Sequence, residues 1–240
     1  MRVASGHHGS PVSSRYGWLT SRRTVALVLL ALLVVGLRVV TVPPANAGRA
    51  QMEFDPARLG AQEQEMWEAY YYRQWPRLFS LLIQVTREQF GLSLAQSLYA
   101  AYLGTQAQRD AVKNGPAAGG AEAYMRDFYA YVKEPTGGRY DPARAAAKEI
   151  RWWVVHREAG HRTDESTELE DAFTELYVEL YQRPADQMRP AARARARAVE
   201  ISDRWLDEGQ PQNSPLLVEI RTELIASYTA LHQALNDPRS

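Results

Sequence analysis

Residues 215–236 have the sequence PLLVEIRTELIASYTALHQALN, and this stretch decides the fold class. Its apolar residues recur every three or four positions and share one face of a helix with 3.6 residues per turn. They are Leu217, Ile220, Leu224, Tyr228, Leu231 and Leu235. The segments 78–89 and 169–180 have the same spacing, and no strand-like alternation follows residue 50. The sequence therefore predicts an all-α body.

Helix boundaries can be read from capping residues and glycines. Three helix starts have an N-cap residue before a proline: Asp55-Pro56, Asp141-Pro142 and Ser214-Pro215. Helix ends are expected at Gly91, Gly115, Gly137 and Gly209. About eight helices are predicted, near 56–74, 76–90, 93–113, 120–133, 142–161, 167–182, 190–208 and 215–236. Their short connections favour an antiparallel, bundle-like arrangement in one domain, 48–240.

The composition of the 240-residue chain is that of a folded protein. Apolar residues make up 45% and charged residues 23%, with 28 basic and 28 acidic side chains. These values exclude a fully disordered, a collagen-like or a polytopic membrane chain. The absence of cysteine excludes disulfides, thiolate metal sites and a cysteine nucleophile.

The first 47 residues differ from the rest in charge and hydropathy. They contain five arginines and no acidic residue, whereas the remainder has more acidic than basic side chains. An apolar stretch covers 25–42, interrupted by Arg38. It is just long enough to cross a bilayer if Arg38 reaches the headgroups. With Arg22 and Arg23 before the stretch, the positive-inside rule places the body outside the cytoplasm.

Two interpretations of this segment stay open. Ala45-Asn46-Ala47 has the pattern of a signal-peptidase site, which predicts secretion after cleavage following Ala47. Ser21-Arg22-Arg23-Thr24 also resembles a twin-arginine export motif, although it lacks the usual aromatic residue. Retention of the segment predicts a single-pass membrane anchor instead, which is the interpretation we favour.

The segment Glu149–Glu158 is the most informative for function. On a helical wheel Glu149, His156 and Arg157 lie within the apolar arc that carries Trp152 and Trp153. Ionisable groups on a buried face need partners. Glu63, on the apolar face of the first helix, is the proposed partner of Arg157 or His156. These four residues form either a satisfied structural network or a ligand-binding or catalytic site.

Three segments resemble a group of uncharacterised, all-helical bacterial proteins. They are Met66–Tyr71, Arg87–Gly91 and Trp152–Arg157. The resemblance covers most of the body and implies an all-helical fold. It implies no activity.

The sequence has few of the motifs that are typical of metal sites, catalytic nucleophiles or phosphate-binding loops. The only Glu-x-x-His match of the body is Glu158–His161, whereas a helical di-iron site needs two such pairs and two further glutamates. No nucleophile elbow, phosphate loop or dinucleotide fingerprint is present. We expect no metal, no cofactor and no nucleic-acid partner.

A basic stripe of arginines, Arg189, Arg193 and Arg197 with Arg195 beside them, follows an acidic stripe on the preceding helix. The acidic residues are Glu168, Asp171, Glu175 and Glu179. The two stripes pair with each other, or the arginines face anionic lipid.

One or two rings of an aromatic cluster are expected to be exposed as a partner surface. The cluster consists of Trp67, Tyr70, Tyr71, Tyr72 and Trp75.

The sequence as a whole predicts a membrane-anchored or secreted helical domain. Its expected role is that of a non-catalytic interaction or structural module. The alternative is a ligand-binding or enzymatic domain that uses Glu63, Glu149, His156 and Arg157.

Overall fold

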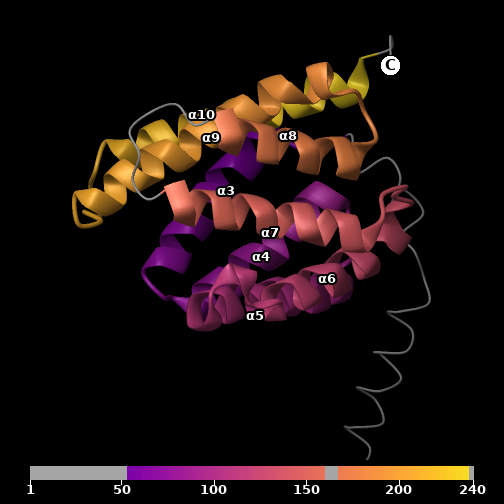
Figure 1. Cartoon of the computed structure of the whole chain (residues 1–240), viewed down its shortest axis with the longest axis horizontal. Helices are drawn as coiled ribbons and strands as arrows, with labels where there is room; N and C mark the ends of the chain where they lie inside the picture. The colour runs from indigo at the N-terminus through magenta and orange to yellow at the C-terminus, as the bar shows by residue number, and fades with distance from the viewer. Residues whose placement is uncertain (1–52, 160–166, 238–240) are drawn as a thin grey trace, which may run out of the picture. The chain divides into compact units, whose positions relative to one another are not determined.

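A computed structural model describes residues 53–159 and 167–237 of the chain (Figure 1). Within these ranges the structure has eight α-helices and no strand, which confirms the all-α prediction. The helices are α3 (Pro56–Tyr71), α4 (Trp75–Phe90), α5 (Leu94–Asn114), α6 (Gly120–Thr136), α7 (Pro142–Ala159), α8 (Thr167–Tyr181), α9 (Ala185–Asp207) and α10 (Leu216–Asn236). A short 3-10 helix, η1 (Pro116–Ala118), joins α5 to α6.

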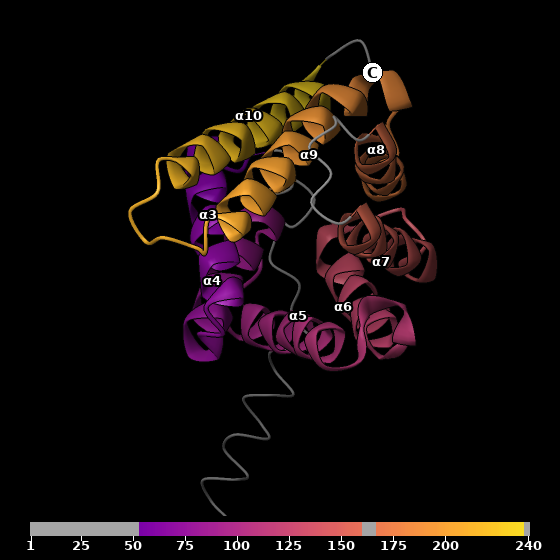
Figure 2. The same cartoon turned by 60° about the vertical axis from the view of Figure 1, so that its left-hand side comes forward.

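The eight helices form a closed ring. Each helix packs against the next one in sequence, and α10 returns to pack against α3. Figure 2 shows the ring, with α9 and α10 side by side and α8 seen nearly end-on. The main hydrophobic cluster draws buried residues from all eight helices. The expected helical bundle therefore takes the form of a ring whose side chains meet in the interior.

Local sequence explains most helix ends. The Asp55 carboxylate accepts hydrogen bonds from the N–H groups of Ala57 and Arg58, at 2.9 and 3.2 Å, so it caps α3 as predicted. Gly91 ends α4 in the left-handed conformation, with φ 62°. A capping box formed by Ser93 and Gln96 starts α5, and the sequence analysis missed it.

The start of α9 differs from the prediction. The helix begins at Ala185 rather than near 190, so Pro190 lies inside it. An interior proline removes one helical hydrogen bond. The earlier start places Met188 in the core with no exposed surface, and burial of this side chain offsets the lost hydrogen bond.

Ring closure depends on a close approach at Gly60 of α3. A methyl group added at Gly60 would lie 2.6 Å from the backbone nitrogen of Ile225 on α10. Only a residue without a side chain lets the first and last helices of the ring approach this closely.

The prediction for the N-terminus falls outside the described residues. In the two described ranges no helix has the length and apolar character needed to cross a bilayer. The apolar stretch 25–42 and the rest of 1–47 are not part of these ranges.

Candidate functional site

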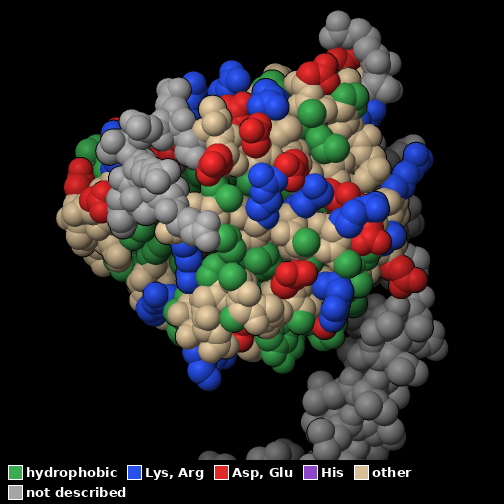
Figure 3. Space-filling view, in the orientation of Figure 1, with side chains coloured by type: hydrophobic (Ala, Val, Ile, Leu, Met, Phe, Trp, Pro, Cys, Tyr) green, Lys and Arg blue, Asp and Glu red, His purple; other side chains and the backbone are tan. Residues whose placement is uncertain are grey.

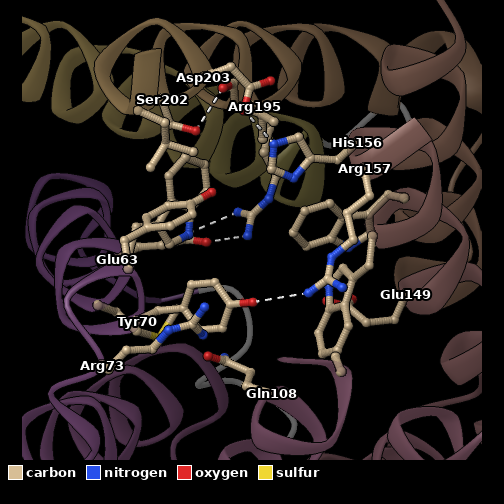
Figure 4. Close-up of a pocket in the computed structure, with 18 residues that line it drawn as sticks. Glu63, Tyr70, Arg73, Gln108, Glu149, His156, Arg157, Arg195, Ser202 and Asp203 are labelled. Carbon is tan, nitrogen blue, oxygen red and sulfur yellow. Dashed lines mark hydrogen bonds and ion pairs between the residues drawn. The ribbon is translucent and has the colours of Figure 1, made fainter. Parts of the chain in front are cut away.

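A pocket of about 380 Å³ opens into the interior of the ring. Its walls come from α3, α5, α7 and α9, which are far apart in the sequence (Figure 4). All four residues of the predicted cluster line it: Glu63, Glu149, His156 and Arg157. The structure thus brings the four together around one pocket, although their contacts differ from those predicted.

Glu63 is held by a residue that the prediction did not assign to it. Its side chain is 2% exposed and forms a two-point ion pair with Arg195 of α9, whose Nη1 lies 2.9 Å from Oε2. The Tyr228 hydroxyl donates a 2.7 Å hydrogen bond to the same oxygen. The predicted pairing of Glu63 with Arg157 or His156 is therefore wrong.

The predicted cluster omitted Arg195, as it omitted Asp203 and Arg73, which also line the pocket. The Arg195 side chain is only 15% exposed, and its guanidinium also lies over the Phe173 ring. Burial alone would lower the pKa of the Arg195 guanidinium, but the Glu63 carboxylate holds this pKa well above its ordinary value. The position of Arg195 in the sequence could have indicated this burial. Arg195 lies off the four-residue spacing of Arg189, Arg193 and Arg197, so it faces a different side of α9 from that stripe.

Glu149 lies on the wall of the pocket between two donors. The Tyr129 hydroxyl donates to Oε2 at 2.9 Å, and the Trp153 indole N–H donates to Oε1 at 3.2 Å. Burial raises the pKa of the Glu149 carboxyl above its ordinary value, and the nearby Arg195 charge offsets this only in part. This carboxyl is thus an acid shifted toward its neutral form inside a ligand-sized cavity.

His156 forms a second polar pair on the pocket wall. Its Nε2 lies 2.7 Å from Oδ1 of Asp203 on α9, and each side chain is 18% exposed. The Trp152 ring stacks beside the imidazole, with 6.5 Å between the centroids. Because α7 and α9 flank α8, the His156–Asp203 contact connects two helices that are not neighbours in the ring.

Arg157 is exposed, so the prediction that it is buried against an acid is wrong. Its Nη2 donates to the Tyr70 hydroxyl at 3.4 Å, across the pocket (Figure 4). Arg73, which follows α3, lies over the rings of Tyr70 and Trp75. Arg157 lies in the last turn of α7 and is exposed, which a helical wheel cannot show.

A second cavity of about 130 Å³ lies inside the ring. It shares Glu63, Glu149 and Arg195 with the larger pocket. On its far side Gln89 of α4 donates a 3.1 Å hydrogen bond to the Tyr181 hydroxyl of α8. The ring interior is therefore bridged by polar side chains rather than filled by aliphatic ones alone.

The two charged stripes pair only in part. Arg189 contacts Glu170 and Asp171, and Arg193 contacts Glu170. Glu175 and Glu179 turn instead toward α7, where they pair with Lys148, Arg151 and Arg144. Basic and acidic side chains are accordingly interspersed over the face formed by α7 and α8 (Figure 3). Arg197 is exposed, and its proposed contact with lipid stays a prediction.

The metal prediction concerns groups of side chains that could hold an ion. No group of three metal-ligating side chains occurs within 53–159 and 167–237. The weak metal candidates, the Glu158 side chain and His161, lie outside what the structure describes.

The five clustered aromatics around residues 67–75 are all partly buried, so the expected exposed ring among them is absent. The exposed large apolar side chains of α5 are Leu94, Leu98, Tyr99 and Tyr102.

Comparison with known proteins adds no identity. No protein-family model matches the chain, and neither a curated protein nor a solved structure matches it. The resemblance to uncharacterised helical bacterial proteins stays a prediction.

Proposed function

We propose that this domain binds a small molecule in the pocket between α3, α5, α7 and α9. The observation that carries the proposal is the pocket itself, with a volume of about 380 Å³ in the range of ligand sites. Polar groups from three helices converge on it: Glu63, Glu149, His156, Arg157 and Asp203. Aromatic rings supply the apolar part of the wall, as ligand pockets require.

The openness of the polar cluster favours binding over a purely structural role. A structural network would be closed to solvent, as the Glu63–Arg195 pair nearly is. His156 and Asp203 keep 18% of their side-chain surface exposed, and Arg157 is exposed. The buried pair therefore supports the pocket, while the other side chains are accessible to a ligand.

We also propose that the domain acts outside the cytoplasm, attached to the membrane by the apolar stretch 25–42. Support comes from the basic leader and the positive-inside rule. Cleavage after Ala47 would release the same domain as a secreted binding protein. Its role as an interaction module for a protein partner stays a prediction.

Ligand binding is tested by filling the pocket. Gln108 of α5 points into it (Figure 4), so Gln108→Trp should occupy its volume. The matched control is Gln106→Trp, on the same helix and outside the pocket lining. Ligand-observed NMR with naphthalene-sized probes should show binding to the full-length protein and to Gln106→Trp.

The pocket-filled variant should lose this binding while its Tm stays near that of the wild type. Binding that survives in Gln108→Trp, or no binding by the wild type, would overturn the proposal.

A further inference from the structure

We propose that the ligand of this pocket is a small anion with a planar, apolar body. The inference rests on the proposed function and specifies its ligand class. It follows from which hydrogen-bonding groups of the pocket already have partners and which do not.

The acidic groups of the pocket all have protein partners. Glu63 accepts from Arg195 and Tyr228, and Asp203 is paired with His156. Glu149 accepts from Tyr129 and Trp153. A cationic ligand would therefore have to displace a protein donor from Glu63 or Glu149, which costs that buried donor its partner.

The hydrogen-bonding groups of the pocket that lack a strong partner are donors. Arg157 has one long hydrogen bond, to a neutral hydroxyl, and the Arg73 guanidinium lies over two aromatic rings. Neither forms an ion pair with a described carboxylate. The indole N–H of Trp152 is buried and forms no hydrogen bond. Three donors of one pocket thus await an acceptor.

Arg73 and Arg157 of the pocket lie next to the same residue, Tyr70. Both approach Tyr70, since Arg157 donates to its hydroxyl and Arg73 lies 5.6 Å from its ring centroid. Arg157 belongs to α7 and Arg73 to the loop after α3, and both line the pocket beside Tyr70 (Figure 4). A carboxylate or sulfonate between them would receive charge-assisted hydrogen bonds, which are the strong ones.

The rest of the pocket wall is aromatic and favours a ligand with a flat, apolar ring system. The rings of Trp67, Tyr71, Trp152 and Trp153 line the cavity, with Val199 among them. Aromatic rings favour other rings in stacked or edge-to-face contact. An aromatic carboxylate satisfies both requirements, because its ring meets the indoles while its charge meets the guanidiniums.

The test compares two probes with the same ring system and nearly the same shape, the anion 2-naphthoate and the neutral 2-naphthamide. Isothermal titration calorimetry uses the full-length protein in lipid nanodiscs, with empty nanodiscs as the blank. We expect naphthoate to bind about tenfold more tightly than the amide. Arg157→Gln and Arg73→Gln should each weaken naphthoate by about tenfold and leave the amide nearly unchanged. Arg126→Gln, at an exposed arginine of α6 that does not line the pocket, is the control.

The outcomes separate the two proposals. Equal binding of both probes, abolished by Gln108→Trp, would overturn the anion preference and leave ligand binding intact. No binding of either probe would overturn both. An equal loss in Arg126→Gln would mean that naphthoate senses net charge only, and this too would overturn the proposed role of the two arginines. A Tm near that of the wild type shows that the exposed arginine variants are folded.

Discussion

Glu63 and Arg195 are separated by 132 residues in the sequence and form a two-point ion pair inside the ring. The pair connects α3 to α9, which are separated in the ring by α10, and Tyr228 of α10 completes it. Side chains of α3, α9 and α10 are thus connected by a buried ion pair where the ring closes. Glu63 and Arg195 also form part of the pocket wall.

Removing one member of this pair should be severely destabilising. Arg195→Met leaves the Glu63 carboxylate buried without its cation and should cost about 3–5 kcal/mol in urea unfolding. Arg193→Met is the matched control, since Arg193 is 54% exposed and pairs at the surface with Glu170; its cost should stay below about 1 kcal/mol. The double variant Glu63→Leu, Arg195→Met should recover part of the loss. Similar losses in the two single variants would contradict the buried pair.

Arg157→Ala should leave stability almost unchanged, within about 0.5 kcal/mol, because its guanidinium is exposed and its hydrogen bond to Tyr70 is long. The measurement is the free energy of unfolding in urea. A loss of several kcal/mol would instead show a buried, paired arginine, as the helical wheel predicted.

Two glycine variants test how closely the helices approach. Gly60→Ala places a methyl group against the backbone of Ile225, so it should push α10 from α3 and cost about 1–3 kcal/mol. Gly104→Ala of α5 meets only Leu82 side-chain atoms at 3.7 Å and should stabilise the helix by about 0.5–1 kcal/mol. Thermal unfolding of both proteins measures the difference. The same sign for both substitutions would argue against the tight α3–α10 contact.

Glu149 should make stability depend on pH. Because burial raises its pKa in the folded state, folding is favoured at low pH, where this carboxyl is protonated, and weakens as pH rises from its ordinary value of 4.5 through the raised value. Glu149→Gln removes that penalty and should raise Tm at pH 7 by about 2–4 °C. The Tm difference between the variant and the wild type should shrink as the pH is lowered toward 4.5. A difference that does not change with pH would mean that Glu149 titrates normally.

The export prediction can be tested in cells. A reporter enzyme that is active only outside the cytoplasm, fused after Ser240, should give signal because of the basic leader and the apolar stretch 25–42. N-terminal sequencing of the purified protein then distinguishes its two forms. A chain beginning at Gly48 indicates cleavage, and an intact leader indicates an anchor. Activity of a reporter that works only in the cytoplasm would contradict the prediction.

The sequence by itself determined the local structure of this protein. Helical periodicity, the caps at Asp55 and Asp141, and glycines such as Gly91 and Gly137 predicted eight helices, because these signals act within one or two turns. The wheel also selected Glu149 and His156 as residues of a polar cluster, since ionisable groups on an apolar face stand out in any single helix.

Only the tertiary structure decided which helices meet and which charges pair. Glu63 binds Arg195 rather than Arg157, and His156 binds Asp203, because ring closure brings α3, α7 and α9 around one interior. Partner choice depends on distances between residues that are more than forty positions apart, and a one-helix pattern contains no such distances. The pocket has the same origin: it is the interior space that eight helices leave when the last one packs against the first.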